Sequence, residues 1–141
     1  MQDSHTGPVS LASFEGMWRV QRRIEDRLGT PARFEGEAHF TPIPEGLAYS
    51  ETGRMHVGSQ AFSATRGYIW RATGAGISVW FDEARFFHSF TLGLSAVSSH
   101  HCAPDQYDVR YVFDAWPVWT SDWRVRGPRK DYRMVTEYTR G

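Results

Sequence analysis

Three ionisable residues, Arg22, Glu51 and Arg66, alternate along the sequence with apolar and aromatic residues, as in β-strands. Alternate residues of a strand share a face, so each charged group lies on the face of its apolar neighbours. If those faces point into a core, the charges must pair with one another or with a bound molecule, because an unpaired buried charge is very costly. Two guanidinium groups against one carboxylate leave one positive charge, and the planar fork of an Arg suits a bound carboxylate or phosphate.

A second group of candidate residues carries imidazole and thiol chemistry. His88 lies two residues before Phe90 in an aromatic row, and His100 and Cys102 share a strand face. Together with His88 they suggest a metal site, and a single axial His suffices for haem. Neither CxxC nor HExxH occurs, so we expect no metal and no cofactor, and haem or metal binding is the lesser alternative.

Tyrosines also fall on the rows that we expect to face inward. Their hydroxyl groups can orient a polar ligand head group or act as acids, and the alternative is that they fill volume and bond to the backbone. These tyrosines are Tyr49, Tyr68, Tyr107, Tyr111, Tyr132 and Tyr138.

Length and composition set limits on the kind of protein. The 141 residues suit one domain over 1–141, with residues 1–7 as a flexible leader, and 16 basic residues balance 16 acidic ones. We therefore expect neither nucleic acid nor a membrane as partner. With no signal peptide, no membrane-spanning apolar run and a single Cys, we expect a cytoplasmic protein, monomeric or homodimeric.

The elements that must position these residues are short strands separated by turn signals. A helical turn over 8–14 precedes them, and no helix is long enough for a crossover between parallel strands. The pattern predicts an all-β, antiparallel barrel of about 8–10 strands. We expect strands near 17–24, 33–41, 47–55, 62–70, 77–81, 86–90, 96–102, 107–113, 123–125 and 132–140.

The opening Gly16-Met17-Trp18, after a short helical turn, resembles the signature of the lipocalin and wider calycin barrels. The resemblance implies that Trp18 plugs one end of the barrel and that a late Arg, here Arg140, packs across its ring. The whole chain also resembles a small uncharacterised single-domain family grouped with calycin-like barrels. That match rests on segments 16–24, 85–88, 100–107 and 123–132, and it implies a fold without an activity.

Two further surfaces have both a functional and a structural interpretation. Arg126, Arg129 and Lys130 cluster at the last hairpin, where they could bind a phosphate or simply be solvated. Trp116 and Trp119 flank a proline and form either a partner contact or a cap on the barrel end.

We therefore expect a protein that binds a small amphipathic or aromatic anion, with Arg22 and Arg66 holding the charge and Glu51 setting their geometry. The alternatives are an isomerase, cyclase or decarboxylase that uses the same cluster, or an interaction module built on the two tryptophans. A purely structural arrangement, in which one Arg pairs with Glu51 and the other reaches the barrel mouth, also remains open. The expected ligand-binding residues are Arg22, Glu51, Arg66, Tyr68, His88, Phe90, His100, Tyr107, Tyr111 and Tyr132.

Overall fold

The computed structural model describes residues 7–141. The expected leader over 1–7 therefore lies outside the described residues, except for Gly7. One 3-10 turn, η1 (Leu11–Phe14), precedes ten strands. They are β1 (Gly16–Asp26), β2 (Ala32–Ile43), β3 (Gly46–Val57), β4 (Gln60–Thr73), β5 (Gly76–Trp80), β6 (Phe86–Thr91), β7 (Ser95–Cys102), β8 (Asp105–Ala115), β9 (Val118–Gly127) and β10 (Lys130–Arg140).

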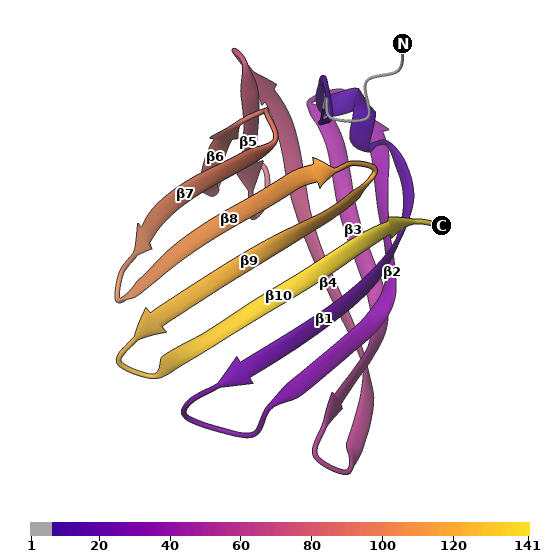
Figure 1. Ribbon diagram of the computed structural model, residues 1–141. Coiled ribbons are helices and arrows are strands. Elements are labelled where there is room, and N and C mark those ends of the chain that lie inside the picture. The colour runs from indigo at the N-terminus through magenta and orange to yellow at the C-terminus, as the bar shows by residue number, and fades with distance from the viewer. Residues whose placement is uncertain (1–6) are drawn as a thin grey trace.

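The strands form one antiparallel sheet that curls into a nearly closed barrel (Figure 1). Its order is β6-β5-β4-β3-β2-β1-β10-β9-β8-β7. β1 pairs with β10, and all the remaining neighbours in the sheet are consecutive strands of the chain, joined as hairpins. The two ends of the sheet, β6 and β7, lie beside each other, and no ladder joins them in the described part of the chain. The expected antiparallel, calycin-like barrel is confirmed.

Strand alternation determines which side chains fill the interior. On β2, Phe34, Ala38 and Phe40 are buried, while Glu35 and His39 are exposed. The same pattern turns the faces of Trp18 on β1 and Tyr49 on β3 inward. Because a strand has a side-chain period of two, one correctly assigned residue fixes the sidedness of its whole strand.

Alternation over the expected strand 86–90 places Phe86 on the same inward row as His88 and Phe90, and this placement of Phe86 is wrong. A register shift in the β5–β6 pair pairs Val79 with His88 but Trp80 with Phe86, which leaves Phe87 as an extra residue. Phe87 is fully buried and Phe86 is 43% exposed. A bulge of this kind reverses the in/out order of the residues beyond it.

Aromatic rings close the end of the barrel that carries η1. Phe14 is fully buried and lies 5.2 Å from the ring of Trp116 and 5.5 Å from that of Trp119. Trp18 contacts the same two tryptophans at 5.5 and 5.8 Å. Trp116 and Trp119 thus cap the barrel and do not form an exposed partner surface.

Arg140 fastens η1 to this closed end. Its guanidinium carbon lies 3.8 Å from the centre of the Trp18 ring, as the resemblance implied. It donates hydrogen bonds to the carbonyl oxygens of Ser13 at 2.7 Å and Glu15 at 2.9 Å. Gly16 turns the chain from η1 into β1 with a φ of 114°, a conformation that strains any residue with a Cβ.

Strands β2 and β3 approach closely where Gly36 faces Gly53. A Cβ at Gly36 would lie 2.1 Å from the carbonyl oxygen of Thr52 and 2.7 Å from the Cα of Gly53. This glycine pair lets the sheet bend sharply next to the buried charges. Over the described residues, no helix has the length and apolar character needed to cross a membrane.

Candidate functional site

The centre of the barrel holds a buried ion pair between β1 and β3. Arg22 donates two parallel hydrogen bonds to the carboxylate of Glu51, at 2.7 and 2.8 Å. Its Nε donates a third, at 2.8 Å, to Oγ1 of Thr136 on β10. Only 5% of Arg22 and 1% of Glu51 are exposed. All three guanidinium nitrogens are therefore satisfied within the protein.

Both members of this pair are ionised. Burial opposes the ionisation of Glu51, but the hydrogen bonds and charge of Arg22 outweigh it and hold the pKa of the carboxyl below its ordinary value. Burial also opposes the charge of Arg22, and the contact with Glu51 raises the pKa of the guanidinium above its ordinary value. The pair thus behaves as a fixed salt bridge.

Two tyrosines extend the pair into a hydrogen-bonded network. The hydroxyl of Tyr49 donates to Glu51 and lies 3.0 Å from the hydroxyl of Tyr138. Burial raises the pKa of both phenols, so each hydroxyl keeps its proton. The ring of Tyr138 stacks on Trp119 at 3.7 Å, which ties the network to the closed end.

Arg66 on β4 also points inward, but its surroundings differ from those of Arg22. It is half-buried, and its guanidinium carbon lies 5.6 Å from the centre of the Trp123 ring. Among the described residues, no acidic side chain lies within ion-pair distance of it and no hydrogen-bond acceptor contacts it. One inward-facing positive charge is thus left after Arg22 and Glu51 have paired, as the sequence predicted.

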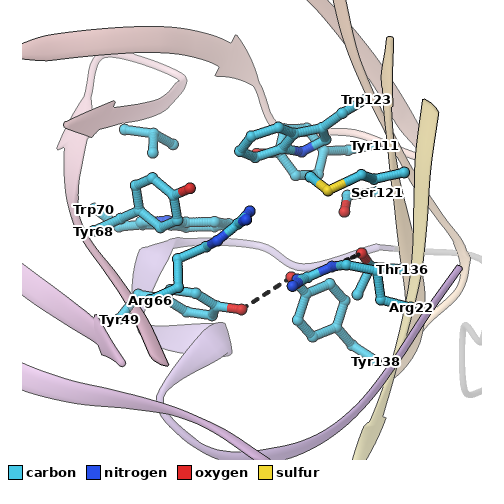
Figure 2. Close-up of a pocket in the computed structure, with 12 residues that line it drawn as sticks. Arg22, Tyr49, Arg66, Tyr68, Trp70, Tyr111, Ser121, Trp123, Thr136 and Tyr138 are labelled. Carbon is cyan, nitrogen blue, oxygen red and sulfur yellow. Dashed lines mark hydrogen bonds between the residues drawn. The ribbon is translucent and has the colours of Figure 1, made fainter. Parts of the chain in front are cut away.

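Arg66 extends into the middle of a pocket within the barrel (Figure 2). The pocket encloses about 380 Å³ of space between side chains, including the part open to solvent, but its cavity for a water centre measures only about 20 Å³. That is room for about one water molecule. The barrel interior is thus largely filled. The lining residues are Arg22, Tyr49, Arg66, Tyr68, Trp70, Val79, Tyr111, Ser121, Trp123, Met134, Thr136 and Tyr138.

Hydroxyl groups supply the remaining polarity of the pocket. Burial raises the pKa of Tyr68 to about 12, and it raises that of Tyr111 well above its ordinary value. Both phenols are therefore neutral hydrogen-bond donors. The Tyr68 hydroxyl makes no hydrogen bond to the described residues, whereas the Tyr111 hydroxyl lies 2.9 Å from Nε2 of His88. Arg66 and Tyr68 are thus two of the donors left free at the pocket, and the Ser121 hydroxyl, which also lines it, makes no hydrogen bond to the described residues either.

The structure brings part of the expected ligand-binding set to the pocket. Arg22, Arg66, Tyr68 and Tyr111 line it. Glu51 lies behind the wall as the partner of Arg22. The expected residues outside the lining are His88, Phe90, His100, Tyr107 and Tyr132.

His88 is a core residue behind the pocket wall. It is 2% exposed, and burial lowers its pKa to about 3, so the ring is neutral. Its Nδ1 has no hydrogen-bond partner in the described structure. Cys102, which we expected on the same face as His100, is exposed. Within residues 7–141, no group of three or more His, Cys, Asp or Glu side chains is arranged to hold a metal ion.

Sequence reasoning missed several lining residues. Ser121 and Trp123 lie on the same face of β9, but the expected strand began only at Trp123. Thr136 shares the inward row of Tyr132 and Tyr138 on β10, and its role as acceptor for Arg22 was not foreseen. The signal was present in each strand, since Ser121 lies two residues before Trp123 and Thr136 two before Tyr138.

The basic cluster at the last hairpin is largely neutralised. Arg126 pairs with Asp108 at 2.9 Å, and Lys130 pairs with Asp105 at 2.9 Å. Arg129 is exposed at the hairpin tip. The cluster thus matches a solvated turn.

Comparison with known proteins extends the fold assignment. An S-type phycobiliprotein lyase from Guillardia theta has a similar structure, with a TM-score of 0.63 over 94% of this chain and 93% of that one, at 10% sequence identity. No curated protein matches the sequence. Residues 14–140 match DUF6314, described as a family of unknown function. The match spans all ten strands and includes Arg22, Glu51 and Arg66. The chain therefore belongs to this family.

Proposed function

We propose that this protein binds a small aromatic or amphipathic molecule with an anionic group, which contacts Arg66 inside the barrel. The observation that carries the proposal is the inward guanidinium of Arg66, which has no acidic partner among the described residues. Glu51 faces Arg66 across the β3–β4 pair, but its carboxylate contacts Arg22 and acts on Arg66 only at longer range. A half-buried charge keeps part of its hydration, and an anionic group would supply the direct ion-pair contact that Glu51 does not.

The two inward Arg residues have separate roles in this proposal. Arg22 already gives its three nitrogens to Glu51 and Thr136, so a ligand anion would have to compete with a bidentate salt bridge. Arg66 has its donors free, and the hydroxyl of Tyr68 lies in the same pocket. Charge-assisted hydrogen bonds from these two groups would orient the anion, while the rings of Trp70 and Trp123 would contact an aromatic body.

The size of the cavity sets a condition on binding. About 20 Å³ does not hold an aromatic ring, so side chains at the open part of the pocket must move. Arg66, Tyr68 and Trp123 are the half-buried members of the lining. The proposal therefore includes a displacement of the Arg66–Trp123 contact when the ligand enters.

A matched pair of fluorescent probes tests the proposal. 1-Anilinonaphthalene-8-sulfonate carries an anionic group, and N-phenyl-1-naphthylamine has the same aromatic framework without it. We expect the wild-type protein to bind the sulfonate more tightly. Arg66→Leu should weaken sulfonate binding by about 10- to 150-fold, since hydrogen bonds to charged groups contribute about 1.5–3 kcal/mol. Its affinity for the neutral probe should stay unchanged.

Arg19→Leu is the control, because Arg19 is exposed on the outer face of β1. Arg66→Lys should retain part of the affinity, since it keeps the charge but loses the planar fork. Equal sulfonate affinities for the wild type and Arg66→Leu would refute the proposal.

The enzyme alternative finds less support in the site. A general base or acid at neutral pH needs a carboxyl pKa raised toward neutrality. The pKa of Glu51 is held below its ordinary value, and both oxygens already accept hydrogen bonds. We therefore assign to Glu51 the role of holding Arg22 in position, and not a role in proton transfer.

The structural neighbour suggests one ligand class for the test. It is named as a phycobiliprotein lyase, and a bilin-like molecule joins an aromatic framework to carboxylate groups. Biliverdin, followed by its visible absorbance, therefore belongs beside the naphthalene probes.

A further inference from the structure

The first part of β4, residues 60–68, has a free backbone edge. On one side, β4 pairs with β3 from Gln60 to Trp70. On the other side, the ladder with β5 covers only Ile69 to Thr73. Residues 60–68 therefore present an unpaired row of N–H and C=O groups, and no backbone bond from the rest of the described chain covers it.

This edge carries only one of the features that protect edge strands from pairing with another chain, the inward-pointing charge of Arg66. Natural edges carry charged side chains, prolines or bulges. Segment 60–68 reads QAFSATRGY, with no Pro, no acidic residue and one charge, Arg66, which points inward. Its ladder with β3 has no register shift. Phe62 is 47% exposed on the inward face, and the outward positions hold only Ala, Ser, Thr and Gly.

The ends of the sheet do not compete with this edge. β7 is also poor in charge, but its free side lies against β6, where Phe86 contacts His100 at 6.1 Å. Pairing β4 of one copy with β7 of another would also be head-to-tail, which propagates into open chains unless it closes a ring. Pairing between two β4 edges is isologous and closes as a dimer.

We propose that two copies of this chain form a dimer by antiparallel pairing of their β4 edges, about a two-fold axis at Ala64. In this register, Ser63 lies opposite the partner's Thr65, a pair that can hydrogen-bond. Phe62 lies opposite the partner's Arg66, which suits a cation–π contact. A register centred on Arg66 would instead place two like charges face to face, which is unfavourable.

The dimer would complete the pocket. The free edge of β4 borders the open side of the barrel beside Arg66, and Phe62 is the large apolar residue exposed there. Pairing places the partner's Phe62 beside Arg66 on the same face of the extended sheet, where it adds an apolar side chain at the edge of the pocket. The interface itself does not depend on the ligand-binding proposal, because the backbone edge and its neutral side chains carry it.

The first test is the mass of the protein in solution. Light scattering after size exclusion, at about 100 µM, should give twice the chain mass of 16.2 kDa. The double variant Ser63→Lys/Thr65→Lys places Lys opposite Lys across the axis and should give the monomer mass. The matched control is Ser50→Lys/Thr52→Lys, on the same outer face of β3, which is paired on both sides. The control should remain dimeric.

The second test fixes the register. Facing residues of antiparallel strands have Cα atoms about 4.5–5.5 Å apart, within reach of a disulfide. In a Cys102→Ser background, Ala64→Cys should form a covalent dimer under mild oxidation, and Thr52→Cys should not. A monomer mass for the wild type, or a dimer that the edge lysines leave intact, would overturn the proposal. A dimer that Ala64→Cys fails to cross-link would overturn the register. Circular dichroism of each variant checks that it is folded.

Discussion

The buried neutral His88 should make the stability of the barrel depend on pH in a defined window. The pKa of His88 is lowered from 6.5 to about 3, mainly by burial. As the pH falls below 6.5, the unfolded chain takes up a proton that the folded protein cannot, so stability falls. This loss continues until the pH reaches the folded pKa. Between pH 7.5 and pH 5, it amounts to about 2 kcal/mol.

The variant His88→Gln isolates this contribution. Gln retains a group that can bond to the Tyr111 hydroxyl, which lies 2.9 Å from Nε2 of His88, but it does not titrate. Urea unfolding followed by Trp fluorescence at pH 7.5 and pH 5 gives the free energy of unfolding for each protein. The wild type should lose about 2 kcal/mol more than the variant, or about 1 M in the urea midpoint.

Most carboxyl groups stay ionised between pH 7.5 and pH 5, so they add little to the change in stability over this window. His101→Gln is the control, since His101 is exposed on β7, and it should follow the wild type. His88→Phe serves as a second variant if Gln destabilises the fold. If the wild type and both His88 variants lose equal stability over the window, the reasoning from burial is refuted.

Two further predictions concern the buried pair and the closed end. Glu51→Leu should lower the free energy of unfolding by about 3–5 kcal/mol in urea, because it leaves Arg22 buried without its partner, and Arg22→Met/Glu51→Leu should recover most of that loss. A Glu51→Leu variant as stable as the wild type would contradict the role of Glu51 as the partner of Arg22. Arg140→Leu should cost about 1–2 kcal/mol, seen as a thermal midpoint lower by several degrees, because it removes the contact with Trp18 and two hydrogen bonds to carbonyl groups. An unchanged midpoint would contradict that role.

Strand alternation made the sidedness of the charges predictable. Arg22, Glu51 and Arg66 were placed inward from their neighbours alone, because the period of two leaves only two choices per strand. The structure confirms these placements. Segment 33–41 alternates cleanly between Phe34, Ala38 and Phe40 on one face and Glu35, Glu37 and His39 on the other, and its buried and exposed faces follow this alternation.

The pairing of these charges could not be predicted in the same way. Arg22 and Glu51 lie on β1 and β3, with β2 between them, so their contact depends on two successive registers and on the curvature of the sheet. A strand pattern gives the face of a residue but not its height along the barrel. Which of the two Arg residues contacts Glu51 directly therefore emerges only from the folded structure.

The bulge in β6 marks a second limit of the sequence pattern. Phe86, Phe87 and His88 are all large and ring-bearing, so either alternation places an aromatic inward. Only the register shift opposite Trp80 decides that Phe87 and His88 are both buried. Local composition carried no signal for this choice.

The ladder between β1 and β10 has a consequence for how the protein is made. Trp18 pairs with Arg140 and Asp26 with Tyr132, so the earliest strand waits for the last one before the sheet can close. Ladders between strands so far apart in sequence form slowly. During translation, β1 must remain without its second neighbour until β10 has left the ribosome, and throughout that interval its open side is exposed to chaperones and to other nascent chains.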